Sequence, residues 1–145
     1  MEVYNLMPSE GKVIAFPFSA APDGSPPVLI LESAEDELRD LYERSGASPM
    51  LRAHYKKRIQ YLAEHGRQAV FHGEWFEHLE DELYSMRFNG ISRLGNLRII
   101  YCFYGKYIVL LVPFLEQGSK SYDEGKRTAR ARLKLIKEGK VVWNS

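Results

Sequence analysis

The chain has 145 residues, 45% of them hydrophobic, and a formal net charge of +1. This length and composition exclude wholesale disorder and predict one domain, spanning residues 1–145, with a substantial core. Its single cysteine, Cys102, excludes an internal disulfide and fits a reducing compartment. No segment reaches the roughly 18 apolar residues of a membrane span, and the N-terminus lacks the pattern of a signal peptide. We therefore expect a cytoplasmic protein with no membrane partner.

The net charge hides an uneven distribution along the chain. Residues 1–49 carry three basic and nine acidic side chains, a net charge of −6, whereas residues 50–145 carry 17 basic and 10 acidic ones, a net charge of +7. A basic segment favours an anionic partner. The alternative is that two complementary surfaces neutralise each other within one fold. We divide the domain into an acidic N-terminal extension, residues 1–47, and a core, residues 48–140.

The first half of the chain predicts a hairpin followed by two helices. The apolar runs 12–18 and 28–31 flank a loop with an Asp-Gly turn signal, so they are expected to pair as strands. A helix is expected to begin at Ser33, where acidic residues fill the first turn, and to end at Gly46. A second helix is expected over 48–65, between a serine-proline start and a glycine stop. The stretch that follows, up to residue 82, shows no clear periodicity of apolar residues and is not assigned to a helix or strand.

The second half predicts three strands and a helix. The runs 83–88, 97–104 and 107–115 alternate or are continuously apolar, and Gly-Lys between the last two fits a tight hairpin. From Ser121 a capping-box pattern predicts a helix with a narrow apolar stripe. The rest of this helix is crowded with basic residues: Lys126, Arg127, Arg130, Arg132, Lys134 and Lys137.

These elements predict an α+β fold, with helices on one side of a small, mostly antiparallel sheet and a basic helix near the C-terminus. Two arginines, Arg87 and Arg98, lie inside predicted strands, where charge is costly. A sheet with inward arginines beside a basic helix is typical of a surface that binds phosphates.

Several of these residues also form a familiar pattern. The strings Leu83-Tyr84-x-Met86-Arg87 and Arg98-Ile99-Ile100-Tyr101, an apolar strand reaching Phe114, and Lys120 before a basic helix follow in this order. Together they resemble the RelE/HigB superfamily of bacterial and phage toxins, in particular the phage-derived HigB-like branch. The resemblance covers about residues 50–138. One departure is Glu116, which stands where the family usually has a lysine.

The resemblance implies a RelE-like fold, with N-terminal helices packed on the sheet, and the activity of a type II toxin. Such toxins are ribosome-dependent endoribonucleases that cleave mRNA without a metal or other cofactor and so inhibit translation. The implied partners are the ribosome, mRNA and a cognate antitoxin, expected to be a helix-turn-helix protein. Glu116 favours an alternative: a catalytically weakened RelE-fold module that binds RNA or protein in a regulatory role.

RNA cleavage at the 2′-hydroxyl requires a base, an acid and stabilisation of a charged transition state. We expect Arg87 and Arg98 to contact one phosphate, because the arginine fork grips two oxygens at once. Lys120 is expected to add positive charge, and Tyr122 to stack on a base or assist proton transfer. For contact with RNA we select four residues of the basic helix: Lys126, Arg127, Arg130 and Lys134.

Each of these assignments has a structural alternative. Arg98 could instead pair with Glu80 or Glu82, Lys120 could be a solvated loop lysine, and the basic helix could be an ordinary solvated face. The acidic helix that begins at Ser33 could shield the basic surface, although a structural addition is the favoured interpretation. The spacing of His72 and His78 matches no zinc pattern, so no metal site is expected.

Overall fold

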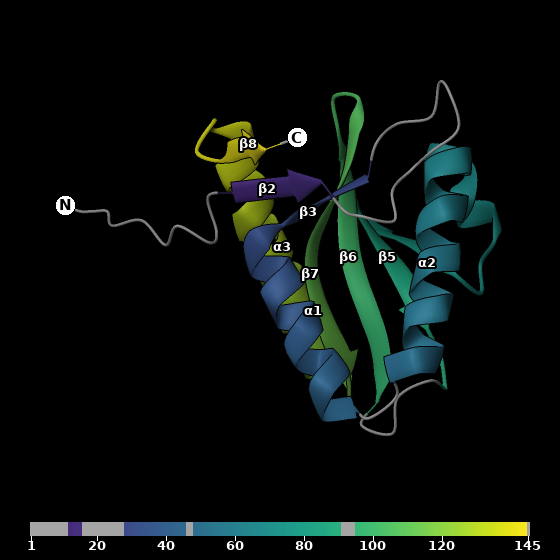
Figure 1. Ribbon diagram of the computed structural model, residues 1–145. Coiled ribbons are helices and arrows are strands. Elements are labelled where there is room, and N and C mark those ends of the chain that lie inside the picture. Colours follow the sequence, from purple (N-terminus) through teal and green to yellow (C-terminus); the bar gives the residue numbers. More distant parts are fainter. Residues whose placement is uncertain (1–11, 16–27, 46–47, 91–94, 145) are drawn as a thin grey trace.

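The computed structural model describes residues 12–15, 28–45, 48–90 and 95–144. It confirms the α+β class and shows a mixed sheet of seven strands in the order β4-β5-β6-β7-β3-β2-β8 (Figure 1). The strands are β2 (Lys12–Ala15), β3 (Val28–Leu31), β4 (Phe76–Glu80), β5 (Leu83–Phe88), β6 (Asn96–Tyr104), β7 (Tyr107–Glu116) and β8 (Val142–Asn144).

The sheet is mostly antiparallel, as expected. The pairs β2–β3, β4–β5, β5–β6 and β6–β7 are antiparallel, and the pairs β3–β7 and β2–β8 are parallel. The predicted hairpins β2–β3 and β6–β7 both form. The turn of the second hairpin contains Gly105 at a φ of 57°, a left-handed conformation that favours glycine. Of the predicted first strand, residues 16–18 lie outside the described part of the chain.

The segment before residue 48 contributes to the interior of the sheet. Strand β3 lies between β7 and β2, and Val28, Ile30 and Leu31 are almost completely buried in the same core as Ile108 and Leu110. Parallel pairing of β3 with β7 requires a long crossover, and the helices and strands of residues 32–107 provide it. The central strands therefore come from both ends of the chain.

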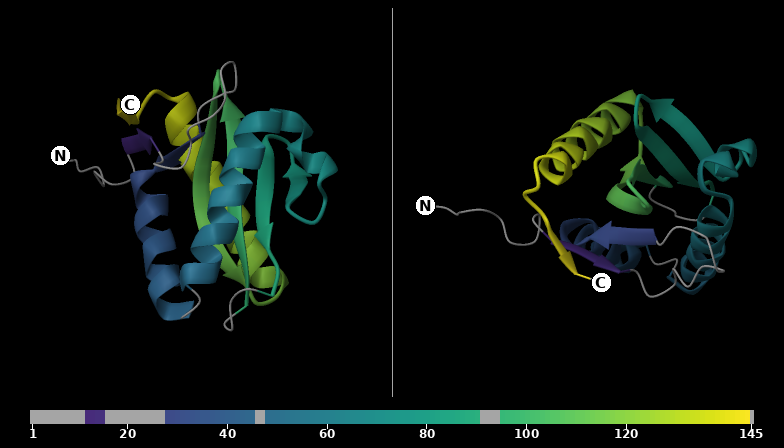
Figure 2. Two further views of the ribbon diagram at one scale, coloured as in Figure 1. Left: turned by 45° about the vertical axis from the view of Figure 1, so that its right-hand side comes forward. Right: turned by 90° about the horizontal axis from the view of Figure 1, so that it is seen from above.

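Three helices cover the sheet: α1 (Glu32–Ser45), α2 (Ser48–His65) and α3 (Ser119–Lys137). A short 3-10 helix, η2 (Gly66–Phe71), follows α2. The expectation that the helices lie on one side is wrong. In Figures 1 and 2, α1 and α2 lie in front of the sheet and α3 lies behind it. Helices on both faces are possible because β5 and β6 bury side chains on both of their faces.

Helix α3 begins two residues earlier than expected. Gly118, at a φ of 150°, precedes its first residue, and Ser121 lies inside the first turn instead of capping it. The Ser121 hydroxyl accepts a hydrogen bond from the backbone N–H of Gln117 at 3.0 Å and donates one to the carbonyl of Gly118 at 2.7 Å. The serine thus closes the turn between β7 and α3. The predicted stop at Gly139 is confirmed by its φ of 72°.

Strand β7 changes its surroundings halfway along its length. Its pairing with β3 ends at Leu110, and a bulge in its pairing with β6 leaves Leu111 without an opposite residue. Pro113 lies beyond this point, where a missing N–H interrupts no bond to β3. The carbonyl of Leu111 instead accepts a hydrogen bond from Nη1 of Arg132 at 2.9 Å, so a side chain of α3 closes this part of the edge.

Two strands and the start of a second helix, α1, were also not predicted from the sequence. Strand β4 occupies part of the stretch that showed no period, and β8 pairs with β2 at the edge of the sheet. Helix α1 begins at Glu32, one residue before the expected serine, and its predicted stop at Gly46 lies outside the described residues. In the part of the chain that the structure describes, no helix has the length and apolarity required to cross a membrane.

Candidate functional site

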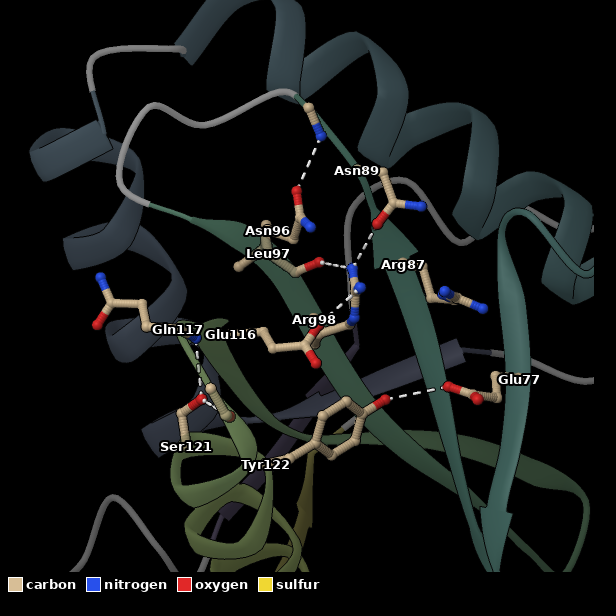
Figure 3. Close-up of polar contacts among 12 residues, drawn as sticks. Glu77, Arg87, Asn89, Asn96, Leu97, Arg98, Glu116, Gln117, Ser121 and Tyr122 are labelled. Carbon is tan, nitrogen blue, oxygen red and sulfur yellow. Dashed lines mark hydrogen bonds and ion pairs between the residues drawn. The ribbon is translucent and has the colours of Figure 1, made fainter.

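Arg87 and Arg98 face each other across two neighbouring strands. They are directly opposite residues in the antiparallel register of β5 and β6, so their side chains emerge on the same face of the sheet. This is the face covered by α3, and the start of that helix lies beside the two arginines (Figure 3). Like charges in opposite positions destabilise a sheet. The pair therefore needs either neutralising partners within the protein or an anion.

Arg98 has partners from the ends of three strands. It is 4% exposed; its Nη2 lies 2.7 Å from Oε1 of Glu116, and its Nη1 donates to Oδ1 of Asn89 at 2.9 Å (Figure 3). Nη1 also donates to the carbonyl of Leu97 at 3.3 Å. The suggested pairing with Glu80 or Glu82 is wrong, because those carboxylates bind cations of α3. Arg98 is thus held rigidly and already faces one carboxylate.

Arg87 is held more loosely. Its side chain is half-buried, and Nη1 donates to the carbonyl of Gly73 at 3.3 Å. The Nε atoms of Arg87 and Arg98 are both buried and have no hydrogen-bond partner among the described residues. Ser85, a completely buried residue two positions before Arg87 on the same face, places its hydroxyl next to that of Tyr122, whose pKa it lowers. Buried polar groups are rarely left unpaired, so the two Nε donors on one face of the sheet favour an oxyanion ligand.

A tyrosine and a glutamate complete this face of the sheet. The Tyr122 hydroxyl, from the first turns of α3, donates to Oε1 of Glu77 on β4 at 3.1 Å (Figure 3). Burial raises the pKa of the Tyr122 hydroxyl, and the nearby Glu77 carboxylate also raises it. The neighbouring Ser85 hydroxyl and the charge of Arg98 lower it, but the pKa stays above its ordinary value. The tyrosine is therefore protonated at neutral pH and can donate a proton. Glu77, a carboxylate on the strand next to that of Arg87, can accept one.

The tyrosine is positioned by a tight contact between α3 and β7. The Tyr122 ring packs edge-on against Phe114, with ring centroids 5.3 Å apart, and Phe114 lies against the backbone of Gly125. A Cβ atom on Gly125 would be 2.8 Å from two carbons of the Phe114 ring. Glycine at this position therefore allows α3 to approach the sheet closely and fixes the ring on which Tyr122 rests.

We expect the Gly125→Ala substitution to lower the free energy of unfolding by about 1–3 kcal/mol, because the added methyl group overpacks the contact with Phe114. Urea denaturation followed by circular dichroism measures the change. The matched control is Gly73→Ala, at a position where an added Cβ has no atom within 4 Å. Equal stability of the Gly125→Ala and Gly73→Ala variants would contradict the close approach.

Of the four residues predicted for catalysis, the structure gathers Arg87, Arg98 and Tyr122. Lys120 is exposed in the first turn of α3, and its ammonium group forms no hydrogen bond or ion pair with any described residue. Glu77 and Ser85 were missed. Glu77 belongs to the unpredicted strand β4, so nothing placed it near the arginines. Ser85 could have been found from the alternation of β5, which puts it on the same face as Arg87.

The basic residues of α3 are largely neutralised. Lys126 lies 3.2 Å from Glu80, Arg130 pairs with the same carboxylate, and Lys137 pairs with Glu82. Among the residues selected for RNA contact, Arg127 and Lys134 have no acidic partner in the described part of the chain. The helix therefore presents less free positive charge than its sequence suggests.

His72 and His78 lie apart from the two arginines, and Cys102 lies on the same face of β6 as Arg98 but further along the strand. The His72 ring stacks on Trp75, and Nε2 of His78 lies 2.8 Å from the carbonyl oxygen of Asp81. Across the described residues, no group of three or more His, Cys, Asp or Glu side chains is arranged to hold a metal ion. Burial raises the pKa of the Cys102 thiol to about 12, so this cysteine is a core residue.

Comparison of the chain with protein-family models, curated proteins and solved structures finds no match. The resemblance to RelE/HigB toxins therefore depends on the sequence pattern alone. The fold and the site define the protein as an α+β domain with a candidate oxyanion site, built from Arg87, Arg98, Ser85, Tyr122 and Glu77.

Proposed function

We propose that the protein is a metal-independent endoribonuclease of the RelE/HigB type, the toxin of a type II toxin–antitoxin system that cleaves mRNA on the ribosome. The observation that carries this proposal is the facing pair of arginines, with unpartnered Nε atoms, beside a tyrosine–glutamate hydrogen bond. In this proposal the two arginines bind a phosphate, and Tyr122 and Glu77 transfer protons. Together they provide the elements that transesterification at a ribose requires.

The proposed reaction is an attack of the 2′-hydroxyl on the neighbouring phosphorus. Glu77 takes the proton of that hydroxyl as the O2′–P bond forms, and the guanidinium groups of Arg87 and Arg98 stabilise the charge on the phosphorane. The P–O5′ bond then breaks, and the Tyr122 hydroxyl gives its proton to the 5′ oxygen. The proton on Glu77 returns to Tyr122 through their hydrogen bond. The products are a 2′,3′-cyclic phosphate and a 5′-hydroxyl, and the enzyme is regenerated.

The proposed partners follow from this activity. They are the ribosome and its mRNA, and a cognate antitoxin, which we expect to be a helix-turn-helix protein. The compartment in which these partners meet is the cytoplasm. The reaction uses only side chains of this chain, so the proposal includes no cofactor.

A second candidate function is favoured by Glu116. Its carboxylate lies 2.7 Å from Nη2 of Arg98 and occupies the part of the guanidinium that would bind a phosphate oxygen. A phosphate has to displace it or share the arginine with it. If the carboxylate prevents productive binding, the protein is a regulatory module that binds RNA or protein through the same fold without cleaving it.

The Glu77→Gln substitution tests the proposed function and distinguishes the two candidates. It removes the base but keeps a hydrogen-bond acceptor for Tyr122, so we expect cleavage to fall about 100-fold or more. The measurement is growth and mapped 5′ ends of messages after induced expression in a bacterium. The control is Glu43→Gln, at an exposed position of α1.

Growth arrest and new message ends with wild type and Glu43→Gln, but not with Glu77→Gln, are the expected result. Arrest by all three proteins would remove Glu77 from the reaction. Normal growth with soluble wild-type protein, intact messages and retained binding to ribosomes would favour the regulatory module.

A further inference from the structure

A group of aromatic side chains lies at the surface where α2 passes through η2 into β4. We call it the aromatic corner and define it as Tyr61, His65, Phe71, His72 and Trp75. Tyr61 and His65 stack with ring centroids 3.9 Å apart, and His72 and Trp75 stack at 4.2 Å. Tyr61 also lies edge-on to both His72 and Trp75. Phe71 is 86% exposed, the most exposed of the large hydrophobic residues in the described part of the chain.

The corner is continuous with the candidate site. The backbone N–H of Arg87 donates to the carbonyl of Trp75 at 2.7 Å, and Nη1 of Arg87 donates to the carbonyl of Gly73 at 3.3 Å. The turn that joins η2 to β4 thus carries aromatic rings and holds an arginine of the site. An RNA strand whose phosphate is bound at Arg87 would therefore have its neighbouring nucleotides close to the aromatic corner.

The charge of this region differs from that of α3. Residues 48–73 contain five basic side chains and one acidic side chain, Glu64. Lys57 and Arg67 are exposed there, and the Arg67 guanidinium lies 4.4 Å from the centroid of the Phe103 ring. Arg58 is buried between Trp75 and Phe88, at 4.5 Å and 4.6 Å from their ring centroids, and keeps the first of these rings in place. The α2–η2 side is therefore both basic and aromatic, whereas most of the cations of α3 are paired with acids.

We propose that the aromatic corner and the adjacent basic side of α2 bind single-stranded RNA, with Phe71 stacking on a base near the nucleotide whose phosphate lies at Arg87. The choice of RNA rests on the proposed function. Exposed aromatic rings flanked by cations are suited to single-stranded RNA. Its unpaired bases can stack on the rings, and its phosphates are attracted by the cations. A base-paired duplex keeps its bases covered and cannot use Phe71 in this way.

The test compares two double variants of the full-length protein in binding to a short single-stranded RNA with every 2′-hydroxyl methylated, which prevents cleavage. Phe71→Ala with Lys57→Ala removes the exposed ring and a free cation of the α2–η2 side. Arg127→Ala with Lys134→Ala removes two of the three cations of α3 that have no acidic partner in the described part of the chain. We expect the first variant to lose about tenfold or more in affinity, and the second to lose less.

The emission of Trp75 gives an independent readout of binding at the corner. In a Trp143→Phe background Trp75 is the only tryptophan, and RNA is expected to quench its emission. Unchanged RNA affinity in the Phe71→Ala, Lys57→Ala variant would overturn the inference and leave the corner as a contact surface for protein, with the proposed function intact if the message is still cleaved. Failure of the wild-type protein to bind the RNA would also overturn the inference, and cleavage of ribosome-bound message would then decide the proposed function separately.

Discussion

The Arg87→Ala variant should cleave ribosome-bound message about 10²–10³-fold more slowly than wild type and keep its fold. The rate falls because the side chain provides one of the two charges facing the phosphorane. The fold is expected to be retained because the substitution removes little packing and few contacts. The Arg87 side chain is half-buried and donates one hydrogen bond, at 3.3 Å, to the carbonyl of Gly73. Single-turnover cleavage with purified ribosomes measures the rate, and circular dichroism measures the fold.

Two further variants sharpen this test. Arg87→Lys keeps the charge but loses the planar fork, so it should recover part of the rate and not all of it. Arg44→Ala removes an exposed arginine of α1, which pairs with Asp40, and should cleave like wild type. Full activity of a folded Arg87→Ala protein would exclude Arg87 from the reaction. Arg98 is a less suitable probe, because its substitution also breaks a buried contact with Glu116.

The Arg132→Ala variant should be about 3 kcal/mol less stable than wild type. Arg132 is 5% exposed, and its two terminal nitrogens lie 2.8 Å and 2.7 Å from the carboxylate oxygens of Glu37. It also donates to the carbonyl of Leu111, where β7 has lost its pairing with β3. Removing it leaves a carboxylate and a backbone carbonyl without their partner. Urea denaturation gives the change in the free energy of unfolding.

The matched control for Arg132 is Arg39→Ala on α1. Arg39 pairs with Glu35 and Asp36 at the surface, and exposed ion pairs of this kind contribute less than about 1 kcal/mol. A loss of stability no greater in Arg132→Ala than in Arg39→Ala would show that the Arg132–Glu37 pair does not hold α1 and α3 together.

The position of α1 bears on the idea that the acidic N-terminal segment shields a basic surface. Helix α1 packs on β7, β3, β2 and α2, and reaches α3 through the Glu37–Arg132 pair. Deleting residues 1–46 would therefore remove β3 from the sheet together with α1. The removal of an exposed charge outside this pair, such as Asp40→Asn, is the better way to ask whether the acidic segment weakens RNA binding.

The sequence predicted the fold best where residue type repeats with a clear period. Strand β5 and helix α2 match their predicted bounds of 83–88 and 48–65, because alternation, capping serine and stop glycine are local signals. Strand β4 was missed because its sequence, FEHLE, carries two acids and a histidine on a partly exposed edge. The placement of α3 behind the sheet has no local signal, because it depends on the crossover that brings β3 beside β7.

The candidate site, too, could be predicted only where a local sequence signal exists. Arg87 and Arg98 could be selected because charge inside an apolar strand is unusual, but their partners could not be identified. Glu116 reaches Arg98 across the β6–β7 register, and Glu80 reaches Lys126 across the sheet face. Such contacts join residues far apart in the chain, and only the assembled sheet brings them together.

The most direct test of the central claim is the chemistry of the cleaved ends. Wild-type protein is incubated with ribosomes carrying a defined message, and the ends of the fragments are analysed. We predict a 2′,3′-cyclic phosphate on one side of each cut and a 5′-hydroxyl on the other, with both absent for Glu77→Gln. Fragments with 5′-phosphate ends, or a message that stays intact while soluble protein is bound to the ribosome, would contradict the account.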